Sequence, residues 1–126
     1  MTRLRDIYLC TICGQVVEVV KKGAATLTCC GKHMEKLNEK STELGHEKHL
    51  PVIEKTEEGL RVRVGETPHP MTVEHHIVWI EVLTELRVYR IDLPLDKEPE
   101  AVFCLQGEEI TGVRAYCNVH GLWGRE

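Results

Sequence analysis

The chain has 126 residues, of which 16 are basic and 20 acidic, so its formal net charge at pH 7 is −4. This negative balance argues against a general nucleic-acid binder, which needs a basic surface to neutralise phosphates. No apolar run approaches the roughly 18 residues that cross a bilayer, which argues against a membrane protein. No apolar leader follows Met1, so we expect a cytoplasmic protein.

The first 37 residues form a segment with a net charge of +3, whereas the remainder carries −7. Segments below about 40 residues rarely fold on a hydrophobic core alone and usually need metals, disulfides or oligomerisation. The short apolar pieces in this segment predict small strands with a hairpin turn at Gly23. The polar stretch 38–45 lacks periodicity and predicts a linker. We therefore expect a small metal-stapled domain at 1–37 and a larger domain at 38–126.

The larger segment shows strand signals throughout, without a segment of helical period. Apolar and polar residues alternate most clearly in 60–64 and 86–91. The predicted strands cover residues 51–55, 60–64, 77–83, 86–92, 101–105 and 111–116. Short antiparallel strands at this spacing predict a β-sandwich. We expect Trp79 in its core and Cys104, in the fifth of these strands, as a buried small hydrophobe.

Six cysteines and seven histidines are unusual in so short a chain. Four of the cysteines, Cys10, Cys13, Cys29 and Cys30, lie in the small segment, and four thiolates suit Zn²⁺ or iron. A Cys-x-x-Cys pair combined with two adjacent cysteines predicts a distorted tetrahedron. From spacing alone a structural zinc site is the favoured interpretation, with a disulfide as the lesser alternative in a reducing compartment.

The histidines lie mostly in the larger segment and suggest a second, nitrogen-rich site. Its candidates fall in three patches: His49, then His69 and His75, then Cys117 and His120. Prolines on both sides of His69 restrict the backbone there, which suits a rigid ligand loop. Four imidazoles with one thiolate differ from structural zinc sites, which close at four ligands. Imidazole suits iron, copper, zinc and nickel, and five ligands leave one octahedral position for a reactant.

Together these motifs resemble the desulfoferrodoxins, the two-iron form of superoxide reductase, over essentially the whole chain. The residues that carry the resemblance are 10–13, 29–30, 47–54, 68–71, 75, 77–81 and 117–121. The resemblance implies a mostly β protein, with a desulforedoxin-like N-terminal domain and an immunoglobulin-like, seven-stranded antiparallel β-sandwich.

The resemblance also implies two iron ions per chain. One would be bound by the four early cysteines in a rubredoxin-type centre, which shifts the preference there from zinc to iron. The other would have His49, His69, His75 and His120 in its equatorial plane and Cys117 as axial ligand. The implied reaction is the one-electron reduction of superoxide to hydrogen peroxide, with electrons from rubredoxin or a similar small carrier. The family is typically homodimeric.

Two residues beside His49 have implied catalytic roles. Lys48 would supply a local positive charge for the superoxide anion, and Glu47 would be a removable sixth ligand of the oxidised iron. His76 should point away from its neighbour His75 on a strand and bind no metal. We expect His33 and His46 at the surface and Trp123 near the second metal site. The rival interpretations are a zinc-binding or electron-carrying protein and a superoxide dismutase.

Overall fold

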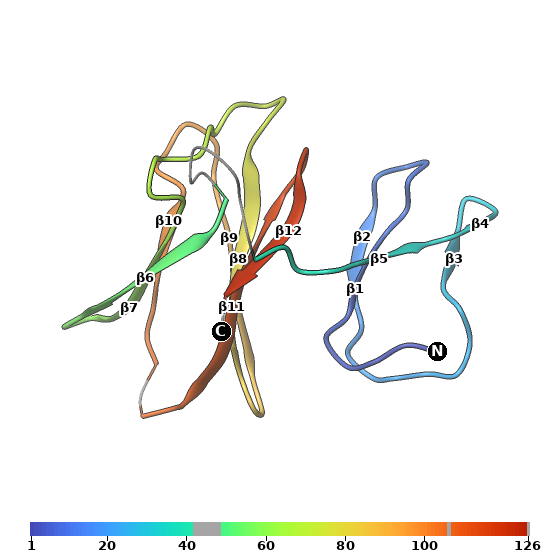
Figure 1. Cartoon of the computed structure of the whole chain (residues 1–126), viewed down its shortest axis with the longest axis horizontal. Coiled ribbons are helices and arrows are strands. Elements are labelled where there is room, and N and C mark those ends of the chain that lie inside the picture. Colours follow the sequence, from blue (N-terminus) through green and yellow to red (C-terminus); the bar gives the residue numbers. More distant parts are fainter. Residues whose placement is uncertain (42–48, 106, 126) are drawn as a thin grey trace. The chain divides into compact units, whose positions relative to one another are not determined.

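The structure, a computed structural model of the chain, describes residues 1–41, 49–105 and 107–125. Regular secondary structure in these ranges consists of β-strands alone (Figure 1). Within the same ranges, no helix is long and apolar enough to span a membrane. The chain divides into two compact units, Met1–Asn38 and Glu39–Glu126.

The first unit is built from five very short strands in two small sheets. They are β1 (Ile7–Leu9), β2 (Val16–Glu18), β3 (Thr28–Cys29), β4 (Lys32–His33) and β5 (Glu35–Leu37). Strand β1 pairs antiparallel with β2 on one side and β5 on the other, while β3 pairs only with β4 among the named strands. The predicted hairpin at Gly23 is wrong, because β2 turns back onto β1 through the Cys10–Cys13 loop and lies in a different sheet from β3.

The described residues of the second unit form seven strands in two antiparallel sheets. They are β6 (Pro51–Thr56), β7 (Gly59–Val64), β8 (Ile77–Thr84), β9 (Val88–Asp92), β10 (Glu100–Phe103), β11 (Ile110–Cys117) and β12 (Gly121–Arg125). The order is β10-β7-β6 in one sheet and β12-β11-β8-β9 in the other. The prediction of a mostly β chain with a seven-stranded antiparallel sandwich is confirmed.

An aliphatic core fills the space between the two sheets. On β7 the residues Leu60, Val62 and Val64 are buried while their neighbours are half-buried, as period-two patterning requires. Ile80 on β8 and Val113 on β11 meet them in the same cluster. Since stacked sheets pack about 10 Å apart through such side chains, this core holds the loops at the sandwich ends in place.

Two features of the second unit differ from the sequence prediction. Strand β12 was not predicted, because two of its five residues are glycines and its pattern does not alternate. It forms by antiparallel pairing along β11. Cys104 is exposed, so the prediction of a buried strand residue is wrong. Strand β10 ends at Phe103, whose ring is buried in the core, and the next side chain leaves the sandwich.

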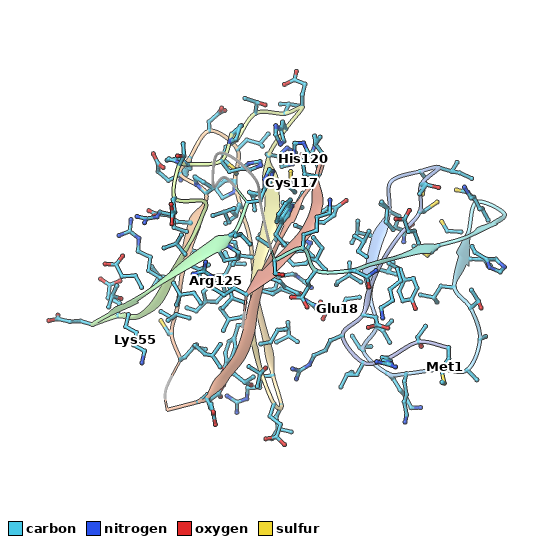
Figure 2. The ribbon with its side chains drawn as sticks, viewed as in Figure 1. Met1, Glu18, Lys55, Cys117, His120 and Arg125 are labelled. Atoms are coloured by element: carbon cyan, nitrogen blue, oxygen red, sulfur yellow. The ribbon has the colours of Figure 1, made fainter. Side chains whose placement is uncertain are left out.

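The two ends of the second unit are chemically different. Figure 2 shows Cys117 and His120 at one end and Lys55, close to the β6–β7 turn, at the other.

Trp79 on β8 is buried, as predicted, and stacks on Tyr116 with a centroid separation of 5.9 Å. Lys40, inside the predicted linker, forms a parallel bridge with Trp123 on β12.

Candidate metal centres

The four cysteines of the first unit lie together at the ends of two turns. Cys10 and Cys13 belong to the turn between β1 and β2, and Cys29 and Cys30 belong to the turn between β3 and β4. Cys30 and the following glycine have positive φ angles, 53° and 72°, which lets the chain reverse within the adjacent pair. The four sulfur atoms lie within 4.8 Å of one another.

The spacing of these sulfur atoms fits a tetrahedral metal ion. Metal–sulfur bonds of about 2.3 Å place the sulfur atoms of a regular tetrahedron about 3.8 Å apart. The Sγ atom of Cys29 lies 3.7 Å from that of Cys13 and 3.9 Å from that of Cys30. Cys10 is buried, whereas Cys13 and Cys30 are exposed. The group is therefore a thiolate site with one edge open to solvent.

Crowding of four thiols also creates a need for a cation. Hydrogen bonds from the backbone amides of Cys13 and Ile12 lower the pKa of Cys10 to about 6. Sharing of hydrogen bonds with Cys10 and Cys13 raises the pKa of Cys29 to about 12. One thiol ionises readily and its neighbour resists, because hydrogen bonds favour the thiolate of Cys10 and the neutral thiol of Cys29. A bound cation removes that conflict, since metal ligation requires all four as thiolates.

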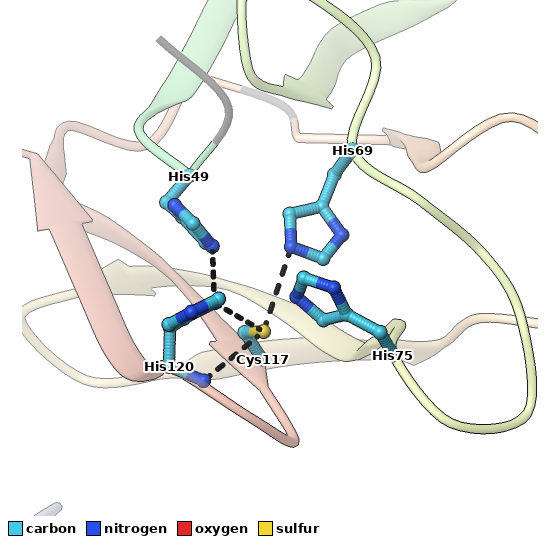
Figure 3. Close-up of side chains that lie close together, drawn as sticks. All are labelled: His49, His69, His75, Cys117 and His120. Atoms are coloured by element: carbon cyan, nitrogen blue, oxygen red, sulfur yellow. Dashed lines mark hydrogen bonds between the residues drawn. The ribbon is translucent and has the colours of Figure 1, made fainter. Parts of the chain in front are cut away.

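A second group gathers at one end of the sandwich from three separate loops (Figure 3). His49 lies two residues before the start of β6, His69 and His75 lie on the connection between β7 and β8, and Cys117 ends β11. His120 lies on the three-residue turn that leads into β12. One ligand atom from each of the five residues lies within 4.8 Å of the others.

The four imidazole rings form a square. Ring centroids lie 4.7 Å apart for His49 and His69, and 4.6 Å apart for His69 and His75. The remaining edges, from His75 to His120 and from His120 to His49, measure 4.9 and 4.7 Å. The diagonal from His49 to His75 is longer, 6.4 Å, as a square requires. Neighbouring rings meet edge to face, so their nitrogen atoms converge on one centre.

The donor atoms in this square fit a metal ion with a thiolate on one side. Metal–nitrogen bonds of about 2.1 Å place adjacent nitrogens about 3.0 Å apart. The Nε2 atom of His49 lies 3.1 Å from Nδ1 of His120. The Sγ atom of Cys117 lies 3.5 Å from Nε2 of His69 and 3.9 Å from Nδ1 of His120. The residues therefore present four nitrogens and one sulfur to a single point.

The surroundings of Cys117 and His69 control which protonation states are available. Burial raises the pKa of the Cys117 thiol, while amide hydrogen bonds from His120 and Val119 and the charge of Lys40 oppose this rise. Burial lowers the pKa of His69 to about 4. His69 donates a hydrogen bond from Nδ1 to the Pro70 carbonyl oxygen, at 2.7 Å, which leaves Nε2 as the free donor atom for a metal. The imidazole is therefore neutral and oriented at pH 7.

The structure describes three of the other candidate residues and leaves three undescribed. Trp123 stacks on the His49 ring at 4.6 Å and 15°, so the prediction that it packs near the second site is confirmed. His76 is outside the five-residue group, and its Nδ1 donates to the Thr72 carbonyl oxygen. His33 is exposed, as predicted. The predicted residues Glu47 and Lys48, together with His46, lie outside the described residues.

Comparison with known proteins places both units in one family. The family model described as Desulfoferrodoxin matches residues 41–126, and the one described as Desulfoferrodoxin, N-terminal domain, matches residues 2–37. A desulfoferrodoxin homolog of Methanothermobacter thermautotrophicus is 50% identical, with 98% of this chain and 99% of that protein covered. The chain belongs to the desulfoferrodoxin family.

Two further relatives carry the name superoxide reductase. The protein of that name from Pyrococcus abyssi is 42% identical and covers 69% of this chain and 91% of its own length. The crystal structure of the superoxide reductase from Treponema pallidum superposes with a TM-score of 0.81 at 26% identity, and covers 96% of this chain and 97% of that one.

Proposed function

We propose that this protein is a superoxide reductase that adds one electron and two protons to superoxide and releases hydrogen peroxide. The observation that carries the proposal is the square of four imidazoles with a thiolate on one side. Membership of the desulfoferrodoxin family and similarity to proteins named superoxide reductase support it. The reaction consumes no second superoxide and forms no O₂, so the electron must come from a separate donor.

Iron is the metal that we assign to both groups, one ion in each. His49, His69, His75, His120 and Cys117 would hold one, and Cys10, Cys13, Cys29 and Cys30 the other. The donor distances fit both ions, and thiolate and imidazole donors suit iron. When bound at the five-residue site, a ferrous ion would supply the electron that superoxide accepts.

The protein's own residues would set up this chemistry in three ways. The buried Cys117 supplies a thiolate, whose electron donation strengthens a metal as a reductant toward oxygen species. The fixed tautomer of His69 holds one corner of the square. Five protein donors would leave room for the substrate as one further ligand of a six-coordinate metal.

Glu47 and Lys48 complete the proposed catalytic group. Lys48, next to His49 in the sequence, would attract the superoxide anion and order the water that delivers protons. Local attraction of this kind operates within about 8–10 Å at ordinary ionic strength and so outweighs distant negative charge. Glu47, two residues before His49 in the sequence, would be a removable further ligand of the oxidised metal.

The remaining roles follow the same division of the chain. We propose that residues 1–37 form a rubredoxin-type iron domain and residues 38–126 the catalytic domain, with 38–45 as the connection. Rubredoxin or a similar small carrier would supply electrons, and two chains would form a homodimer. The biological role would be defence against superoxide in the cytoplasm.

The experiment that tests the function combines metal analysis with pulse radiolysis. The purified protein should contain one iron per group, and its reduced form should consume superoxide with stoichiometric peroxide and no O₂. Oxygen evolution without a reductant would instead identify a dismutase. Zinc in both groups, with no absorption in the visible range, would contradict the enzyme and favour a structural metal protein.

A further inference from the structure

Lys40 lies next to the five-residue site, although it is eighty residues away from His120 in the sequence. Its backbone is held by β12: the Lys40 amide donates to the Leu122 carbonyl oxygen at 2.9 Å, and the Gly124 amide donates to the Lys40 carbonyl oxygen at 3.0 Å. Two hydrogen bonds on either side of one residue define its position. The Lys40 side chain therefore starts from a fixed point beside the turn that bears two of the candidate ligands.

The ammonium group reaches back to that turn. Lys40 Nζ donates a hydrogen bond of 2.7 Å to the carbonyl oxygen of His120. The next residue, Gly121, has a φ of 87°, a conformation that only glycine adopts readily. The lysine thus fixes the turn between Cys117 and β12 at the peptide where the chain reverses.

The same ammonium lies over an aromatic ring that contacts another candidate ligand. Lys40 Nζ is 5.3 Å from the centroid of Trp123, within the range of a cation–π interaction. Trp123 in turn stacks face to face on His49 at 4.6 Å. Lys40 therefore acts on two corners of the square, on His120 through its carbonyl group and on His49 through the tryptophan.

Charge gives these contacts a redox consequence. A fixed positive charge beside a metal site favours the form of the metal with the lower charge, because repulsion grows as the metal is oxidised. Lys40 is exposed, so salt screens its charge more strongly than that of a buried group.

We propose that Lys40 is a positioning residue that holds the Cys117–His120 turn and raises the reduction potential of the iron bound at the five-residue site. This inference rests on the proposed function, because it concerns the metal assigned there. It assigns a role to a residue that lies in the predicted linker rather than among the metal-binding motifs. A plain surface lysine at this position would leave the potential unchanged.

The test is an anaerobic redox titration of the full-length iron-loaded protein, followed by the thiolate-to-iron absorption of the five-residue site. Lys40→Met removes the charge and the hydrogen bond, while Lys40→Arg keeps both. Lys55→Met is the matched control, since it removes the same charge from the opposite end of the sandwich (Figure 2). Lys40→Gln retains a donor without charge and replaces Lys40→Met if that variant does not hold iron.

We expect a lower midpoint potential in Lys40→Met and Lys40→Gln, a nearly wild-type value in Lys40→Arg, and no shift in Lys55→Met. The shift should shrink in high salt. An unchanged potential in the iron-loaded neutral variant, or an equal shift in Lys55→Met, would overturn the role of Lys40. Failure of the wild-type protein to bind iron or to reduce superoxide would instead overturn the proposed function, so the two failures are distinguishable.

Discussion

His69 and Cys117 illustrate how burial prepares individual side chains for metal binding. Each is almost fully buried, and burial favours the neutral form of both. For the imidazole this is the form that binds a metal, whereas for the thiol it is the wrong one. The amide of His120, whose nitrogen lies 3.3 Å from the Cys117 sulfur, offsets part of the cost of the thiolate. A cation in the square supplies the rest.

A pH prediction follows for the metal-free protein. The pKa of His69 is about 4 when folded and 6.5 ordinarily, so between these values the unfolded chain binds the extra proton. The free energy of unfolding of the second unit should therefore rise with pH across this window, and the contribution of His69 should be lost as pH falls from 6.5 towards 4. Urea denaturation followed by tryptophan fluorescence measures this, because both tryptophans, Trp79 and Trp123, lie in the second unit.

The matched variants for this measurement are His69→Gln and His33→Gln. The first removes the buried titrating group and should flatten the pH dependence between 4 and 6.5. The second removes an exposed histidine and should leave it unchanged. An equally steep dependence in His69→Gln would show that another group is responsible.

Sequence patterns located single residues with uneven success. Trp79 and Trp123 lie where they were predicted. Trp79 belongs to an apolar run, and Trp123 is close in sequence to the ligand His120. Cys104 does not lie where it was predicted, because alternation alone cannot tell where a strand ends. No sequence pattern indicated a role for Lys40. Its contacts depend on a bridge to β12, and neither the sequence around Lys40 nor that of β12 predicts this pairing.

The central strands β8 and β11 bury more than an aliphatic core. Glu81 and Arg114 face each other across the pair, and Arg114 Nε donates to Glu81 Oε1 at 2.6 Å. Their side chains are 0% and 5% exposed. Removal of one partner from such a pair leaves a buried charge without its main compensation. The pairing of β8 and β11 therefore depends on this ion pair as well as on the backbone hydrogen bonds between the strands.

We therefore predict that Glu81→Leu destabilises the second unit by about 3–5 kcal/mol. The double variant Glu81→Leu/Arg114→Leu should recover much of this loss, since it removes both charges together. Urea denaturation of the four proteins in the cycle gives the coupling energy directly. Additive effects of the two substitutions would contradict the prediction.

At the level of elements, short apolar runs, two of them clearly alternating, predicted six of the seven sandwich strands in the described residues within a few positions of their observed bounds. The missed strand, β12, has no pattern of its own and takes its conformation from β11. This matters for the site, because the turn between these two strands carries His120. Strand propensity reflects packing against neighbours as much as intrinsic preference, so a glycine-containing edge strand escapes detection.

Over the whole molecule, the two units have different sources of stability. The buried apolar residues described in the first unit are few: Ile7, Tyr8, Cys10 and Val19. A core of this size does not offset the conformational entropy of ordering the chain. The second unit has a continuous core of twelve buried residues. We infer that metal binding stabilises the first unit, while packing stabilises the second.

Replacement of two early cysteines tests this division. In Cys10→Ser/Cys29→Ser we expect loss of one iron per chain and of ordered structure in the first unit. The second iron and the rate of superoxide consumption by the reduced protein should remain, as expected if the second unit is sufficient for the reaction. Metal analysis, circular dichroism and pulse radiolysis measure the three effects.

Cys104→Ser is the control, because this cysteine is exposed and belongs to neither group. It should retain both iron ions and the wild-type rate. Loss of the second iron in Cys10→Ser/Cys29→Ser would show instead that the two units depend on each other.

The sequence alone determined the β class, the division into a cysteine-rich and a histidine-rich part, and the residue types offered to each metal. These properties are local: alternation, turn residues and the spacing of cysteines are all read within a few positions. Only the tertiary structure decided that four imidazoles from three loops form a square around one point, that β12 exists, and that Lys40 reaches His120. Such contacts join residues up to eighty positions apart. The square forms where loops from both sheets meet, β12 forms by pairing with β11, and Lys40 is placed by its bridge to β12, so none of the three can be read from neighbouring positions.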